Sequence, residues 1–270
     1  MDGIVFSQAE LLTLMDATQP ATLVGVDENK LLPSDPNTHQ TLVLEGLQRL
    51  AQRGLLTKQD GINVLEADLF LMAMTVAHPQ LITQIVRYES DGVERKFLYY
   101  QTDQVIIEHT MPSATQYRFA AIPNTSAFIQ RISFIVSESG SAFPHDPVYQ
   151  IQVTQDHFLR IKKLVEAGQT TQALEELLVQ GASNDSARAF VSAMERPLTN
   201  STVAFMRSED ERIVDGREIV FLRSYTSAWV IYQKKPGDSN LLVETVSMMN
   251  LEEKVLDRFL SLVQPVEDVE

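Results

Sequence analysis

The sequence predicts an α+β fold of two halves related by a pseudo-twofold axis, each an antiparallel sheet of about four strands packed with helices. Three observations support this prediction. The chain has 270 residues, 44% of them hydrophobic and 21% charged, which suits a folded chain with a sizeable core. Helical and strand-like periodicities follow one another in the same order twice. Residues 91–98 and 215–222 also share five of eight residues.

The helices of the first half are predicted from capping residues and apolar spacing. Ser7 and Glu10 have the spacing of a capping box, and leucines follow in a short helix that ends before Pro20. Asn63 and Glu66 are the candidate caps of a later helix, which is rich in apolar residues. The expected later helices of this half cover residues 38–53, 63–77 and 125–137.

Four β-rich runs separated by turn signals lie between the last two of these helices. The pair Asp91-Gly92 marks the first turn, because it accepts the positive φ values of a tight hairpin. Residues 111–113, which include a proline, mark the third turn. The expected strands cover residues 81–88, 94–101, 104–110 and 117–122.

The second half repeats this order, and Asp215-Gly216 is expected to form a tight turn like Asp91-Gly92. Asn250 is the candidate N-cap of the last helix. The expected strands cover 148–153, 201–208, 217–224, 227–234 and 241–247, and the first three helices cover 155–167, 170–180 and 184–195. The duplication predicts a first lobe over 1–138, a linker over 139–147 and a second lobe over 148–270, packed as one compact unit.

Charge and composition exclude several classes of protein. The 22 basic and 36 acidic residues give a net charge of −14, which disfavours binding to phosphate backbones or anionic membranes. The helix pair 38–53 and 63–77 could form a winged helix with 63–77 as its recognition helix, but this interpretation fails because residues 64–74 contain no Arg or Lys. The N-terminus lacks the features of a signal peptide, and no stretch approaches ~20 apolar residues. We expect a cytoplasmic protein with no nucleic-acid partner and no membrane insertion.

Motifs that carry chemistry are missing from the sequence. There is no cysteine, no phosphate-binding loop and no nucleophile elbow. The acidic run 208–211 lacks the spacing of a calcium loop and is expected to be a solvated hairpin loop. The histidines form no cluster with metal-ligand spacing: His39, His78, His109, His145 and His157. We expect no metal, no cofactor and no catalysis, with an enzyme whose site is assembled between the two lobes as the alternative.

The order of elements and several landmarks resemble the EspG-like family of type VII (ESX) secretion-associated chaperones. A leucine-rich helix near residues 10–15 is followed by a loop. A second helix then carries Leu47 and Leu50 and ends in Arg53-Gly54-Leu55. Two sheet-plus-helix halves complete the resemblance, which extends over nearly the whole chain. It implies a cytoplasmic, non-enzymatic chaperone or adaptor that shields a helical secreted protein until export.

The resemblance also implies where the partner binds. Recognition in that family involves the central sheet and its long hairpin loop, with help from C-terminal helices. In this sequence the corresponding candidates are the first hairpin, around residues 89–95, and its counterpart at residues 209–217. The candidate partner-binding residues are Glu89, Ser90, Asp91, Glu94, Arg95, Glu209, Asp210 and Glu211. A structural or regulatory component of the same system is a third possibility.

Overall fold

The computed structural model describes residues 3–19, 26, 31–137 and 148–263. The chain divides into two compact units, each assembled from separate segments. Unit 1 comprises Met1–Thr83, Phe97–Phe128 and Met206–Val214, and unit 2 comprises Gln84–Lys96, Ile129–Phe205 and Asp215–Glu270. The predicted linker 139–147 lies outside the described residues, and the predicted lobe boundaries stay a prediction.

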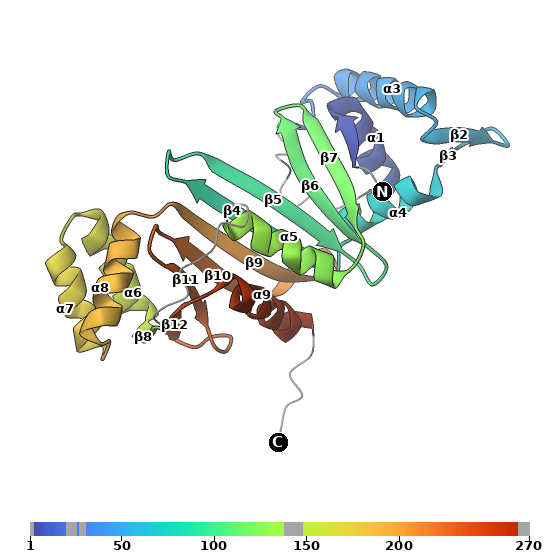
Figure 1. Ribbon diagram of the computed structural model, residues 1–270. Helices are drawn as coiled ribbons and strands as arrows, with labels where there is room; N and C mark the ends of the chain where they lie inside the picture. Colours follow the sequence, from blue (N-terminus) through green and yellow to red (C-terminus); the bar gives the residue numbers. More distant parts are fainter. Residues whose placement is uncertain (1–2, 20–25, 27–30, 138–147, 264–270) are drawn as a thin grey trace. The chain divides into compact units, whose positions relative to one another are not determined.

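The fold is α+β, as predicted, with a large antiparallel sheet of ten strands and a separate two-stranded ribbon (Figure 1). The strand order of the large sheet is β1-β7-β6-β5-β4-β9-β10-β11-β12-β8.

The first elements are β1 Ile4–Ser7, α1 Gln8–Thr18, α3 Pro36–Gln52, β2 Leu56–Gln59, β3 Ile62–Leu65, α4 Ala67–Ala77, β4 Leu81–Glu89, β5 Glu94–Gln101, β6 Ile106–Ser113 and β7 Gln116–Ile122. Then follow α5 Thr125–Ser137, β8 Gln150–Thr154, α6 Gln155–Glu166, α7 Thr170–Val179, α8 Asn184–Glu195, β9 Thr199–Glu209, β10 Arg212–Arg223, β11 Ala228–Gln233, β12 Asn240–Thr245 and α9 Met248–Val263. The twofold relation between halves stays a prediction.

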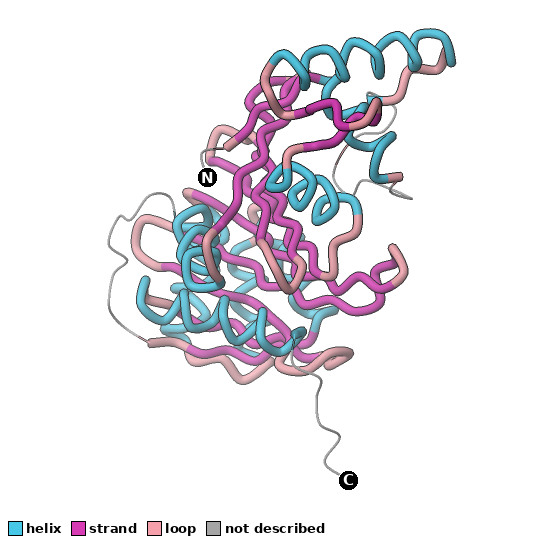
Figure 2. Tube along the Cα trace, turned by 90° about the vertical axis from the view of Figure 1, so that its right-hand side faces the viewer, coloured by secondary structure: helices cyan, strands magenta, loops and turns pink. Residues whose placement is uncertain are grey.

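In unit 1, helices α1 and α4 cover one face of the sheet (Figures 1 and 2). Alternate strand residues such as Leu98 and Tyr100 of β5, and Phe119 of β7, point into the core beneath these helices. Tyr99, between them, points to the opposite face and packs edge-on against Phe128 of α5 at 5.2 Å between ring centroids. The period-two alternation thus provides both faces of the sheet with buried aromatic groups.

Helix α1 begins as predicted, with Ser7 and Glu10 forming a capping box. The carboxylate of Glu10 accepts hydrogen bonds from the Ser7 amide at 2.8 Å and from Arg53 Nη1 at 2.6 Å. Burial raises the pKa of Glu10, but these hydrogen bonds outweigh burial and hold the pKa below its usual value. The guanidinium group of Arg53 also lies over the ring of Phe6 in β1. Arg53 therefore connects the end of α3 to the end of β1 and, through Glu10, to the start of α1.

Helices α1 and α3 approach each other closely at Gly46. A Cβ atom at this position would overlap the Thr13 hydroxyl and the Ala9 carbonyl. The hydroxyl of Thr13 donates to the carbonyls of Ala9, at 2.9 Å, and Val43, at 3.0 Å, and so bridges the two helices. Glycine is needed here for close approach and not for an unusual φ.

We therefore expect Gly46→Ala to destabilise unit 1. The added methyl group must push the helices apart, which costs about 2 kcal/mol by analogy with overpacked cores. Urea denaturation followed by circular dichroism measures this loss. Gly54→Ala is not a suitable control because Gly54 has a φ of +70°. Leu44→Ala is preferable, since Leu44 is exposed on the same helix; equal losses in the two variants would contradict the close-approach explanation.

Two sequence predictions about local structure in unit 1 are wrong, and one hairpin was missed. Asn63 does not cap α4: it lies in β3, and Glu66 alone is the N-cap, accepting from the Leu69 amide at 3.1 Å. Strands β2 and β3 form a short hairpin that was not predicted, and Asp60-Gly61 is its turn, with φ of +48° and +83°. Residues 111–113 extend β6 and form no turn.

The Asp215-Gly216 pair also differs from its prediction, because it lies inside β10 and not in a turn. The hairpin turns five residues earlier, at Asp210 and Glu211, whose φ values are +46° and +62°. A two-residue turn with both φ values positive matches the twist of the flanking strands. The octapeptide similarity therefore does not place equivalent turns at equivalent positions in the two hairpins.

In unit 2, helices α6, α7 and α8 pack on one face of the sheet, around Trp229 (Figures 1 and 2). The three helices have the bounds that were predicted, within one residue at each end. Trp229 is fully buried, and its ring stacks on Tyr149 and tilts against Phe190 at 5.0 Å between centroids. Its indole N–H donates to Ser227 Oγ at 2.9 Å, so the one polar atom of the ring is satisfied.

Helix α9 covers the opposite face of the unit 2 sheet. Arg258 lies 4.1 Å from the ring centre of Tyr232, whose hydroxyl donates to Glu244 at 2.7 Å. Lys254 forms an ion pair with the same carboxylate at 2.6 Å. The helix begins two residues before the predicted cap: the Asn250 amide donates to Ser247 Oγ, which identifies Ser247 as the capping residue. Among the described helices, none is long and apolar enough to cross a membrane.

Candidate protein-binding surfaces

The tip of the β4–β5 hairpin, in unit 2, carries the first group of predicted site residues. Glu89 lies between two arginines, with Oε2 at 3.0 Å from Arg87 Nη2 and Oε1 at 3.4 Å from Arg95 Nε. Arg87 in turn donates to the Ile135 carbonyl of α5. The inner part of this hairpin is thus fixed by the two ion pairs of Glu89 and by the hydrogen bond from Arg87 to α5.

The outer part of the same hairpin is exposed. Asp91 Oδ1 accepts from the Val93 amide at 3.0 Å and shapes the turn, in which Gly92 has a φ of +81°. A hydrogen bond and an ion pair with Lys96 hold the pKa of Glu94 below its usual value, and the pKa of Lys96 is raised by the same contact. Ser90 is part of this turn, which is confirmed as a turn at the predicted place.

The tip of the β9–β10 hairpin, in unit 1, carries the second group. Glu211 Oε1 lies 3.0 Å from Nδ1 of His78, at the end of α4, and the other ring nitrogen lies 3.0 Å from the Thr18 carbonyl. Glu209 pairs with Arg207 at 3.5 Å. Among the described residues, Asp210 forms no ion pair. The two predicted groups belong to different units, so each is a surface in its own right.

This second tip borders a groove of about 720 Å³, which we call the acidic groove. Its lining consists of residues 76–80 at and just after the end of α4, Ile82 of β4, residues 208–211 of the hairpin, and Ile213 of β10. Ile213 is 48% exposed, although it is a large aliphatic residue. The groove therefore combines aliphatic walls with a rim of three carboxylates.

A second groove, of about 440 Å³, lies in unit 2 between α6 and the sheet, and we call it the sheet groove. Helices α6–α8 cover the outer strands β8 and β12, whereas the same face of β9 and β10 extends beyond them. The floor and wall of the groove are apolar: Phe158, Leu159, Val165, Val220, Leu222 and Ile231. Its polar lining includes Lys162 and Glu166 of α6 and Glu218 of β10.

The residues of the sheet groove were not among the predicted site residues. Their apolar character was visible in the sequence, but each has the spacing expected of an ordinary core position. Leu159 is 46% exposed, on a helix whose other apolar residues are buried or half-buried. Which apolar residues stay uncovered depends on where the helices end over the sheet, and no local pattern in the sequence encodes that position.

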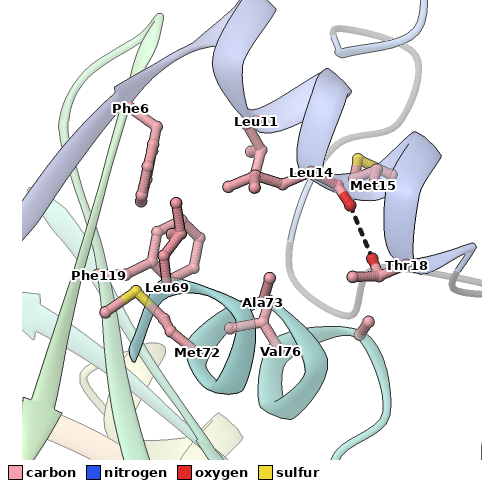
Figure 3. Close-up of a pocket in the computed structure, with 11 residues that line it drawn as sticks. Phe6, Leu11, Leu14, Met15, Thr18, Leu69, Met72, Ala73, Val76 and Phe119 are labelled. Carbon is pink, nitrogen blue, oxygen red and sulfur yellow. Dashed lines mark hydrogen bonds between the residues drawn. The ribbon is translucent and has the colours of Figure 1, made fainter. Parts of the chain in front are cut away.

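A third, smaller pocket lies between α1 and α4 over β1 and β7 (Figure 3). Figure 3 shows Phe6, Phe119, Leu69 and Met72 converging on it, with Leu11 on the opposite side. Its volume is about 20 Å³, which is close to the space that one water molecule needs. This pocket is therefore a packing gap in the unit 1 core, with room for about one water molecule.

Comparison with known proteins identifies the fold. No protein-family model matches the sequence, and no curated protein matches it either. Among solved structures, the chain resembles the Mycobacterium tuberculosis type VII secretion system chaperone EspG5, solved in complex with the PE25-PPE41 dimer. The TM-score is 0.71 at 12% sequence identity, over 98% of this chain and 97% of EspG5. The chain therefore has the fold of a type VII secretion chaperone, as its resemblance to that family predicted.

Proposed function

We propose that this protein is a non-enzymatic chaperone or adaptor of a specialised secretion system, and that it holds a helical segment of an exported protein in the sheet groove. The observation that carries the proposal is a groove with an apolar lining between α6 and the sheet, in which Leu159 is 46% exposed and Val220 is half-buried above the core residues Leu222 and Ile231. Exposed apolar surface of this kind, bordered by polar groups, is typical of partner-binding sites. The fold shared with EspG5, a chaperone solved with a protein dimer, supports the same conclusion.

The size of the sheet groove limits what it can hold. A helix about 10 Å wide that rises 1.5 Å per residue occupies roughly 120 Å³ per residue. The groove of about 440 Å³ therefore accommodates about one turn of helix. This fits the tip of a helical hairpin, or the apolar face of a single helix laid against the sheet. A longer contact would have to extend over the polar residues at the border.

Charge at the border selects the orientation of the partner. Glu218 is exposed on β10, while Lys162 and Glu166 lie one turn apart on α6 with 3.9 Å between their charged atoms. A partner with a basic residue beside its apolar turn would meet Glu218. Such border contacts steer association and fix register more than they add affinity.

Substitution in the sheet groove tests the proposal. The chain is co-expressed with helical exported proteins encoded in its native host, and complexes are measured by size-exclusion chromatography and by the soluble fraction of the partner. We expect Leu159→Glu to weaken binding about tenfold or more, because it places a charge in the apolar contact. Leu178→Glu, at a comparably exposed position on α7 outside the groove, is the matched control.

Two results would contradict the proposal. One is an equal effect of Leu159→Glu and Leu178→Glu on a complex that forms with the unaltered chain. The other is failure of every helical exported protein of the host to form a complex or to gain solubility. Circular dichroism of both variants shows whether each is folded, so a loss of binding is not confused with a loss of structure.

We also propose that the protein does not catalyse a reaction. Each histidine within the described residues has a structural contact: His39 lies 3.8 Å from Asp16, His109 is buried in the unit 1 core, and His157 lies 3.1 Å from Glu176 across α6 and α7. His78 contacts Glu211 at the β9–β10 tip and the Thr18 carbonyl at the end of α1. The alternative is an enzyme with a site between the lobes, and hydrolase and transferase assays of the purified protein would test it.

A further inference from the structure

We propose that the acidic groove is a second protein-binding surface, distinct from the sheet groove, and that it takes a short peptide segment in which an apolar residue is followed by Lys or Arg. It lies wholly within unit 1, whereas the sheet groove lies wholly within unit 2. The inference does not depend on the identity of the partner held in the sheet groove.

The shape and lining of the acidic groove support a peptide. Its aliphatic lining comes from α4, the segment after it, β4 and β10: Ile213 is 48% exposed and Pro79 half-buried, and they lie over the buried Val76 and Ile82. Its volume of about 720 Å³ corresponds to roughly six residues at the packing volume of a helix. A single ion or a small metabolite would leave most of this space to water, whereas a short segment would cover Ile213.

The charge of the border supports a basic segment. Glu209, Asp210 and Glu211 line the groove on the hairpin side, and His78 is the one basic side chain in the lining. His78 is already engaged by Glu211 and by the Thr18 carbonyl. Glu209 is 61% exposed beyond its contact with Arg207, and Asp210 lies at the turn itself. These two carboxylates are placed to receive a cationic side chain from a segment lying on the aliphatic walls.

The groove is built to keep its form without the peptide. The Ser208 amide donates to the Gln80 carbonyl at 2.8 Å, which fixes the hairpin to the segment after α4. The ring of His78 links the tip to the end of α1. Binding therefore requires little ordering of the protein, and less of the interaction free energy is lost to conformational entropy.

The test uses the full chain with ¹³C-labelled isoleucine methyl groups, titrated with blocked hexapeptides. The sequence Gly-Leu-Ile-Lys-Arg-Gly is compared with Gly-Leu-Ile-Glu-Glu-Gly and with Gly-Ser-Ser-Lys-Arg-Gly. We expect the first peptide alone to shift the methyl signals of Ile213 and Ile82 at low peptide concentration. Ile231, which lines the sheet groove, serves as the internal control and is expected to stay unshifted.

Variants test the role of the carboxylates. Glu209→Gln combined with Asp210→Asn is expected to weaken binding of the basic peptide about fivefold, since each exposed charge contact contributes up to about 1 kcal/mol. Asparagine also tolerates the left-handed φ of position 210, so the turn is retained. The matched control removes two exposed acids elsewhere, through Glu175→Gln and Glu195→Gln, and is expected to leave binding unchanged.

Three outcomes would overturn the inference. The first is equal binding of the acidic and basic peptides. The second is a shift at Ile231 in place of Ile213. The third is a response to calcium chloride at Ile213 without a response to the basic peptide, which would assign the carboxylates to a cation. None of these results bears on Leu159→Glu, so failure here and failure of the proposed function are separate observations.

Discussion

Trp229→Ala is expected to destabilise unit 2 by about 3–5 kcal/mol, the usual cost of removing a large buried aromatic group. The ring is fully buried, contacts Tyr149 and Phe190, and fills the space beneath α6–α8. Its removal also leaves Ser227 Oγ without its indole donor. Urea denaturation followed by far-ultraviolet circular dichroism measures the loss without relying on tryptophan fluorescence.

A control for this substitution is available in the adjoining turn. Tyr225 is 81% exposed, four residues before Trp229, and Tyr225→Ala is expected to change stability by less than about 0.5 kcal/mol. Trp229→Phe should fall between the two variants, because it keeps part of the apolar area. A loss below about 1 kcal/mol for Trp229→Ala would show that the helices do not depend on this ring.

The second large effect is a loss of stability at acidic pH that originates at His109. Burial lowers the pKa of His109 to about 4 from the ordinary value of 6.5. The ring lies between aromatic groups, 4.6 Å from the centre of Phe119, and its Nδ1 is 3.2 Å from the Tyr100 hydroxyl. Between about pH 6.5 and pH 4, the unfolded chain therefore takes up a proton at His109 while the folded chain does not.

The sign of the effect follows from proton uptake. Below pH 6.5 the unfolded state is favoured progressively, and the free energy of unfolding falls by about 1.4 kcal/mol for each pH unit. Between pH 6.5 and about pH 4 the free energy of unfolding falls by about 3 kcal/mol in total. It falls no further on account of His109 once this residue is protonated in the folded state as well. The lowered pKa of Glu10 adds a loss of the same sign at still lower pH.

Denaturation curves at several pH values between 7.5 and 4.5 measure this effect. His109→Leu is expected to reduce the slope of the free energy of unfolding against pH by the contribution of one titrating group. This holds whatever the effect of the substitution on stability at neutral pH. Ile107→Val, on the same face of β6, creates a small cavity and should lower stability equally at every pH. Parallel curves for the unaltered chain and His109→Leu would show that the acid sensitivity arises elsewhere.

Features that depend on near neighbours in the sequence were predicted well. Ser7 and Glu10 form their capping box, α5 has the predicted bounds, and the helices around residues 155–195 differ from prediction by no more than one residue at each end. These elements combine a cap or a glycine stop with a clear apolar face. Such signals lie within one helical turn and do not require knowledge of the tertiary fold.

Features that depend on pairing across the fold were predicted poorly. Asp215-Gly216 has the composition of a turn, but strand pairing continues past it to Asp210 and Glu211. Access to the apolar lining of the sheet groove depends on which strands the helices cover. The acidic groove forms because residues far apart in the sequence, near positions 78 and 210, are adjacent in unit 1. Each of these outcomes is decided by nonlocal contacts.

The division of the chain into interleaved segments has a consequence for synthesis on the ribosome. Unit 1 includes Met206–Val214, so it remains incomplete until most of the polypeptide has been translated. At about 5–20 residues per second, the stretch between Phe128 and Met206 takes roughly 4–15 s to be made. During that interval β4 lacks β9, its later neighbour, and its backbone is open to pairing with other nascent chains. No single cut in the gene would separate the two units.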